Sequence, residues 1–223
     1  MWFRIYKCIV RIFIRKSKYV FLGEHFDNQT LILSNHEGMG APMAFELYSK
    51  VPIRFWGTEE MTHNVRKVYK YLSTTYFHNK RHLPRFLAII IGFIAAPFVR
   101  LFYRGLDVIA VEKGAAVVKT MKESEFILRE YKENIVIFPE DSSKGYFNEI
   151  SYFYAGFMLL AEYCYKKGMN LKIMVCNFHK KEKVLVFDKP VQYSELVKDG
   201  ASREEVAEQM RIRCNELRNI NYK

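Results

Sequence analysis

Apolar and polar positions follow two different rhythms along this chain of 223 residues. Short apolar runs rich in β-branched residues predict strands at 30–33, 108–111, 135–138, 172–175 and 184–187. Periods of three and four residues predict helices at 43–50, 115–131, 152–167 and 203–217. Strands interleaved with helices are typical of an α/β fold. We therefore expect a mixed, largely buried sheet flanked by helices.

The first residues carry a helical period of their own. Cations recur in steps of three and four from Arg4 to Lys18, and apolar side chains from Trp2 to Phe13 point in other directions. This pattern predicts a basic amphipathic helix within residues 1–24 that associates with a membrane, followed by one domain at 25–223. The alternative is a terminal helix docked on the domain with a solvated basic face.

A second apolar stretch, residues 86–99, holds 14 uncharged residues between Arg85 and Arg100. A bilayer core asks for about 20 apolar residues, so the stretch is short for a span. It fits either a buried core helix or a shallow monotopic insertion. The cations at 78–85 lie where headgroups would lie and favour insertion.

The two halves of the chain differ in net charge. The net charge is +11, and residues 1–104 carry 16 basic and 6 acidic side chains against 19 and 18 beyond. This asymmetry indicates an anionic partner: membrane lipids, an acidic carrier or nucleic acid. Nucleic acid is the weakest of the three, because the cations accompany apolar segments. The four cysteines form no CxxC pair, which favours a reducing compartment and a site at the cytoplasmic face of a membrane.

The polar residues that could carry out chemistry follow the ends of two predicted strands. The strand at 30–33 runs into Ser34-Asn35-His36-Glu37-Gly38, and Pro42 then opens a helix. The strand at 135–138 ends at Pro139 and releases Glu140, Asp141, Ser142, Ser143 and Lys144. Loops that follow buried strands are common places for catalytic groups in α/β folds.

Taken together, the two stretches resemble the glycerolipid acyltransferases, the family of lysophosphatidic acid acyltransferase. That family pairs N-H-x-x-x-x-D after an early strand with F-P-E-G-T-R-S after a later one. Asn35-His36 and Phe138-Pro139-Glu140 match, about one hundred residues apart. The helix and strand at 117–140 and the short strand ending in Lys113 are also similar. The resemblance covers roughly residues 25–190 and implies a glycerolipid-acyltransferase-like fold.

The chain also departs from the family pattern. The family acid five residues after the histidine is Ala41 here, and neither Glu37 nor Glu46 is placed to replace it. Glu140 remains the most plausible carboxylate near His36. Asp141-Ser142-Ser143 replaces Gly-Thr-Arg, which leaves Lys113 and Lys144 as the phosphate contacts.

The resemblance implies phospholipid biosynthesis by transfer of a fatty acyl group from acyl-CoA or acyl carrier protein to a hydroxyl of a glycerolipid or lysophospholipid. It implies His36 as the general base and Glu140 as its catalytic partner. Asn35, Gly38, Lys113, Ser142, Ser143 and Lys144 are the expected substrate contacts, with backbone amides near Gly38 or Gly40 at the oxyanion. No metal and no cofactor beyond the donor is implied. The alternative is a non-catalytic lipid- and membrane-binding relative.

Overall fold

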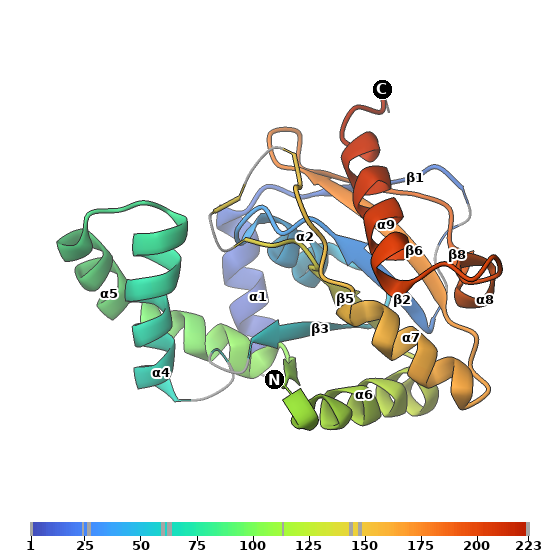
Figure 1. Cartoon of the computed structure of the whole chain (residues 1–223). Helices are drawn as coiled ribbons and strands as arrows, with labels where there is room; N and C mark the ends of the chain where they lie inside the picture. The colour runs from blue at the N-terminus through green and yellow to red at the C-terminus, as the bar shows by residue number, and fades with distance from the viewer. Residues whose placement is uncertain are drawn as a thin grey trace. The chain divides into compact units, whose positions relative to one another are not determined.

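The computed structural model describes residues 2–23, 25, 28–58, 61, 64–112, 114–142, 145–146 and 149–221 (Figure 1). The chain divides into two compact units. The first holds residues 1–53, 121–141 and 147–223, and the second holds 54–120 and 142–146.

The strands of the first unit are β1 (Lys18–Phe21), β2 (Thr30–Ser34), β5 (Asn134–Ile137), β6 (Lys172–His179), β7 (Val184–Phe187) and β8 (Val191–Gln192). They lie in the order β1-β7-β6-β2-β5, with β8 paired to β6. The pairs β1–β7, β2–β6 and β2–β5 are parallel, and β6 is antiparallel to both β7 and β8. The predicted mixed sheet is therefore confirmed.

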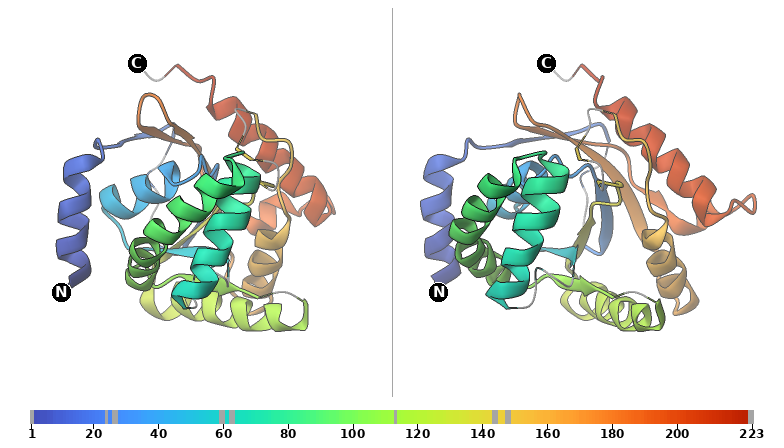
Figure 2. Two further views of the ribbon diagram at one scale, coloured as in Figure 1. Left: turned by 90° about the vertical axis from the view of Figure 1, so that its left-hand side faces the viewer. Right: turned by 60° about the vertical axis from the view of Figure 1, so that its left-hand side comes forward.

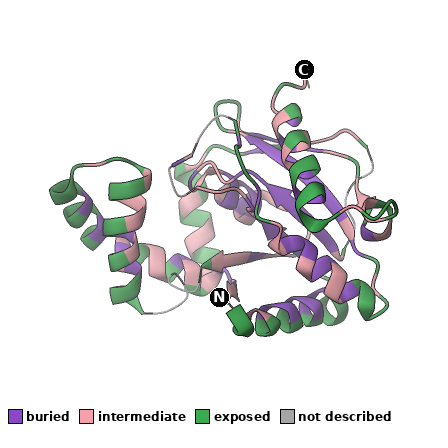
Figure 3. Ribbon diagram, viewed as in Figure 1, coloured by how far each residue is buried: buried purple, intermediate pink, exposed green. Residues whose placement is uncertain are grey.

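The helices of this unit are α1 (Trp2–Phe13), α2 (Gly40–Tyr48), α7 (Gly156–Lys166), α8 (Tyr193–Leu196) and α9 (Arg203–Leu217). Ser202 is the N-cap of α9, and its side chain and that of Glu205 form a capping box. Every residue of β2, β5 and β7 is buried. Figure 3 shows the buried central strands of the sheet in purple. A strand that is covered on both faces has a continuous apolar sequence. For this reason the sequence pattern predicted these strands.

The second unit contains β3 (Ile53–Thr58), α4 (Val65–Lys70), the π-helix η1 (Tyr71–Lys80), α5 (Arg85–Gly105), β4 (Ile109–Val111) and the 3₁₀ turn η2 (Gly114–Ala116). β3 pairs with β4 in parallel. α6 (Val117–Phe126) and the π-helical turn η3 (Ile127–Tyr131) lead the chain back to β5. The sequence pattern did not predict the strands β1, β3 and β8. The mixed charges of residues 59–71 are typical of a surface helix; within this range α4 begins at Val65, and residues 59, 60, 62 and 63 lie outside the described residues.

α5 is longer than the apolar stretch that predicted it. By length and composition its 21 residues suffice to cross a membrane. Gly92 lets α5 approach η1 closely, because a Cβ there would lie 3.1 to 3.2 Å from atoms of Ser73. The side chains on the other face of α5 are exposed: Phe86, Leu87, Ile89, Ile90, Ile91, Phe93, Ile94, Phe98 and Leu101.

α1 lies beside α2, as Figures 1 and 2 show. The Lys7 ammonium donates to the Glu46 carboxylate over 2.9 Å, and the Arg11 guanidinium donates to the Leu47 carbonyl. A cation near the last carbonyls of a helix is stabilised by its dipole. The helix ends at Phe13, not Lys18, because Tyr19 to Phe21 pair with β7. The side chains of Lys7 and Arg11 thus attach α1 to α2. Neither interpretation of the sequence predicted this role for the cations.

Candidate functional site

The register of β2 and β5 brings His36 and Glu140 together. Leu31 pairs with Ile135 and Leu33 with Ile137 in these parallel strands. Continued beyond the strands, the same offset puts Glu140 opposite His36. The backbone N–H of His36 donates to Glu140 Oε1 over 2.9 Å. The expected proximity is confirmed, but the carboxylate contacts the backbone of His36 in this bond.

The imidazole of His36 is oriented by a carbonyl group of its own loop. Its Nδ1 hydrogen-bonds to the backbone oxygen of Gly38, and its ring lies 4.7 Å from the ring of Phe138, centroid to centroid. A carbonyl oxygen can only accept, so Nδ1 carries the hydrogen of the neutral ring. Nε2 therefore carries the lone pair, which is the form a general base requires.

The turn that supplies this carbonyl uses two consecutive left-handed residues. The φ angle is +45° at Glu37 and +68° at Gly38. Glycine adopts this region freely, whereas Glu37 loses about 1 kcal/mol there. The amide of Gly40, considered for the oxyanion, instead donates to the Glu37 carbonyl over 3.2 Å. Gly38 thus contributes its carbonyl to the histidine, whereas the sequence suggested its amide as a substrate contact.

Two cations from distant segments face Glu37. Lys180, in the turn between β6 and β7, places its Nζ 3.6 Å from a Glu37 carboxylate oxygen. Arg218, just after α9, places a guanidinium nitrogen 3.8 Å from the other oxygen. The Glu37 side chain is only 12% exposed, so this pairing is less screened than a surface ion pair. Sequence reasoning missed both cations, because neither belongs to a motif.

The side chain of Asn35 hydrogen-bonds to a neighbouring strand of the sheet. Its side-chain amide donates to the Phe178 carbonyl over 3.1 Å and accepts from the Phe178 N–H over 2.6 Å. Only 3% of the residue is exposed. Both polar atoms of the side chain thus join β2 to β6 and so position the adjacent His36, and the expected substrate contact at Asn35 stays a prediction.

α9 contacts β6, the strand to which the Asn35 side chain bonds. The thiol of Cys214 hydrogen-bonds to the Cys176 carbonyl over 3.3 Å. Burial raises the pKa of this thiol to about 12, and the nearby Glu140 carboxylate adds to the rise. The thiol is thus neutral at physiological pH and acts as a packing group rather than a nucleophile.

The position of the family acid is filled by a buried methyl group. Ala41, on α2, is 0% exposed. Glu46, on the same helix, forms its ion pair with Lys7 of α1. Nδ1 of His36 contacts the Gly38 carbonyl.

The loop after β5 is fixed at its beginning by the segment before α7. Glu140 forms a β-bridge with Phe153, and the amide of Asp141 donates to the Tyr152 carbonyl over 3.1 Å. Burial raises the pKa of Tyr154, and the adjacent Asp141, which hydrogen-bonds to its hydroxyl, raises it further. These bonds hold the backbone on which Glu140 is carried.

Beyond Asp141 the chain enters the second unit. There the Lys80 ammonium donates to the Ser142 hydroxyl over 2.7 Å, and both Lys80 and Arg81 lie over the ring of Tyr146. Sequence reasoning missed this lysine as a partner of Ser142. The other expected substrate contacts, Lys113, Ser143 and Lys144, lie outside the described residues.

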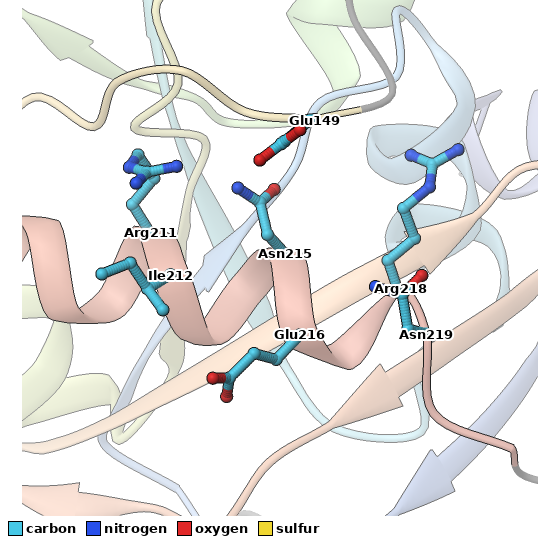
Figure 4. A pocket seen from close by; sticks show the side chains of 7 residues that line it. All are labelled: Glu149, Arg211, Ile212, Asn215, Glu216, Arg218 and Asn219. Carbon is cyan, nitrogen blue, oxygen red and sulfur yellow. The ribbon is translucent and has the colours of Figure 1, made fainter.

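A hollow of about 440 Å³ lies along α9. Figure 4 shows the side chains that line it: Glu149, Arg211, Ile212, Asn215, Glu216, Arg218 and Asn219. Two arginines and two glutamates balance in charge, and Asn215 is bonded to the backbone of Ile150. Among its lining residues is Arg218, which pairs with Glu37.

A second histidine, His179, lies at the end of β6. It is half-buried, and its Nε2 is bonded to the Leu217 carbonyl over 3.1 Å. Burial lowers its pKa. It is therefore a packing residue against the end of α9. Among the described residues no three histidine, cysteine or acidic side chains gather as a metal site.

Comparison with known proteins adds no relative. No protein-family model matches the chain, and no curated protein matches it.

Proposed function

We propose that this protein is an acyltransferase that moves a fatty acyl group from an acyl thioester, acyl-CoA or acyl carrier protein, to a hydroxyl of a glycerolipid or lysophospholipid. One observation carries the proposal: at the ends of two parallel strands, Nδ1 of His36 contacts the Gly38 carbonyl, which favours the Nδ1–H tautomer, and the backbone N–H of His36 donates to Glu140. The resemblance of the two motifs to the glycerolipid acyltransferases supplies the reaction class.

The reaction needs one base and no covalent enzyme intermediate. The acceptor hydroxyl loses its proton to His36 Nε2 as its oxygen attacks the thioester carbon. The C–O bond forms and the carbonyl π electrons move to oxygen. The intermediate then collapses, the C–S bond breaks, and the thiolate takes the proton from the imidazolium. The ester and the free thiol are the products.

The Gly38 carbonyl does part of the work of the family acid. It fixes the tautomer and the orientation of the ring, which are the first tasks of that acid. A neutral carbonyl stabilises the imidazolium less than a carboxylate does. We therefore expect slower turnover than in relatives with the full dyad. Glu140 supports the ring indirectly, through the backbone of His36.

The test is an acyl-transfer assay on purified full-length protein. Long-chain acyl-CoA and acyl carrier protein are each offered with a panel of lysophospholipid and glycerolipid acceptors, and ester formation is measured. We expect turnover that falls at least 10³-fold in His36→Ala. His25→Ala is the matched control, because His25 is exposed and packs on Phe21. Unchanged transfer in His36→Ala overturns the assignment.

One observation favours a second function, a lipid-binding relative without chemistry. Ala41 is fully buried where the family carries its acid, so the usual dyad is absent. The same assay separates the two: stoichiometric binding of lysolipid, with no ester formed by any donor, favours this reading.

We further propose that the protein lies peripherally on the cytoplasmic face of a membrane. α1 turns Lys7 and Arg11 towards α2 and exposes Ile5, Ile9, Ile12 and Phe13. Exposed cations such as Arg4 and Arg15 remain for anionic headgroups. Flotation with vesicles that contain phosphatidylglycerol tests this: we expect co-flotation, weakened at least tenfold in Ile9→Ser/Ile12→Ser/Phe13→Ser. Equal flotation of this variant overturns the role of α1.

A further inference from the structure

The orientation of His36 depends on a backbone conformation that its sequence does not favour. Gly38 presents its carbonyl to Nδ1 because both Glu37 and Gly38 are left-handed, at φ +45° and +68°. A glutamate resists this conformation, since its Cβ crowds the following carbonyl. The surrounding contacts must therefore hold Glu37 in place.

Those contacts come from both segments that face Glu37. Lys180 reaches one carboxylate oxygen from the β6–β7 turn, at 3.6 Å. Arg218 reaches the other from the end of α9, at 3.8 Å. A cation thus lies near each oxygen of the Glu37 carboxylate. The neighbouring backbone is also bonded: the His36 N–H donates to Glu140, and the Gly40 N–H donates to the Glu37 carbonyl.

We propose that Glu37 is a positioning residue for His36: its ion pairs with Lys180 and Arg218 hold the 37–38 turn in the left-handed form that directs the Gly38 carbonyl to Nδ1. The inference rests on the proposed function for its catalytic consequence. The orienting group that the family builds from an aspartate side chain is here a backbone carbonyl, held in place by a neighbouring glutamate.

The proposal distinguishes two substitutions at one position. Glu37→Ala removes the carboxylate and keeps a Cβ that resists the left-handed region, so the turn relaxes. Glu37→Gly removes the same carboxylate, but glycine adopts positive φ without strain. A glutamate that acts through the backbone is therefore replaced better by glycine than by alanine, whereas one that acts by its charge is replaced equally badly by both.

The experiment reads the ring directly. Long-range ¹H–¹⁵N correlation spectra of ¹⁵N-labelled full-length protein at pH 8 report which ring nitrogen of His36 carries hydrogen. We expect the Nδ1–H form in the wild type, a mixture of tautomers in Glu37→Ala, and a return towards the wild-type ring in Glu37→Gly. In the acyl-transfer assay, kcat falls about tenfold in Glu37→Ala with KM within about twofold.

Two further variants keep the test decisive. Lys180→Ala/Arg218→Ala removes the partners from other elements and shifts the ring in the same direction, even if Glu37→Ala folds poorly. Lys132→Ala is the control, because Lys132 is also left-handed, at φ +53°, but lies before β5, at the opposite end of that strand from Glu140. It leaves the His36 ring unchanged.

Three results overturn the inference: a wild-type ring that carries hydrogen on Nε2, an unchanged ring in both Glu37→Ala and the double variant, or a Glu37→Gly ring as disturbed as that of Glu37→Ala. The spectra need no substrate. A ring that responds as expected in a protein that transfers no acyl group refutes the proposed function and leaves the positioning role of Glu37 standing.

Discussion

The loops that follow β2 and β5 begin alike and are held differently. Each leaves a buried parallel strand and carries its key side chain three residues after the last paired position, His36 after Leu33 and Glu140 after Ile137. Side chains of the first loop make several of the contacts that fix it: Asn35 bonds to β6, and Glu37 pairs with two cations.

The second loop is fixed mainly by its backbone. Residues 139–141 bond to the segment at 152–154 through main-chain groups. Two of its side chains contact the first loop: Glu140 accepts from the His36 N–H, and the Phe138 ring lies beside the His36 ring. The imidazole, which must be placed precisely, thus lies in the loop that several side-chain contacts hold in one conformation. The second loop supplies one carboxylate. Substitutions in the two loops should therefore have unequal consequences.

The largest expected effect is on catalysis, at the contact between the loops. Glu140→Ala removes the acceptor of the His36 N–H and should lower kcat about 100-fold, because a displacement of about 1 Å in a catalytic group has this cost. Glu140→Gln keeps an acceptor oxygen and should stay within about tenfold of the wild type. Steady-state acyl transfer measures both, and equal losses would contradict the backbone-anchoring role.

The second effect is on stability, in the first loop. Asn35→Ala leaves the buried N–H and carbonyl of Phe178 without their partner amide, which should cost about 2 kcal/mol of unfolding free energy. Urea unfolding followed by circular dichroism measures this loss. A change under about 0.5 kcal/mol would show that the first loop does not depend on Asn35.

The third effect is a pH dependence in the helix that supports the first loop. Arg213 of α9 forms two hydrogen bonds to the Asp188 carboxylate. Burial, the largest single cause, would raise the pKa of Asp188, but the Arg213 bonds, the Lys189 backbone N–H and the charges of both cations together hold the pKa below its ordinary value. Stability from this pair is therefore fully present above the unfolded pKa of about 3.9 and is lost as pH falls through the lower folded pKa.

The variant Asp188→Asn isolates this pair. The wild type should exceed it by about 1 kcal/mol at pH 6, a modest value because Arg213 is partly exposed. The difference should shrink as the pH approaches 3. Urea unfolding across this pH range checks it, and a difference that grows at low pH would reverse the sign argued here.

The smallest effect belongs to the second loop. Ser142→Ala removes the hydroxyl that accepts from Lys80, and both groups are half-buried, so water replaces the bond. The expected change in unfolding free energy is below about 0.5 kcal/mol. A loss as large as that of Asn35→Ala would erase the contrast between the loops.

Local pattern was enough for several elements. The strand Val184–Phe187 and the helix Arg203–Leu217 have the predicted limits, because an apolar run of four and a capping box mark their ends. The strand β1 escaped detection, because Lys18 continued the cation period of α1 although Tyr19, Val20 and Phe21 favour a strand. Periodicity showed two faces on α1 but not which of them contacts the domain.

The sequence by itself determined the α/β alternation, the two strand ends and the residues that they release, because these follow from periodicity and from the chemistry of short segments. Only the tertiary structure decided what orients His36. The Gly38 carbonyl and its support by Lys180 and Arg218 depend on backbone angles and on contacts across more than 140 residues, and no local pattern of side chains records them.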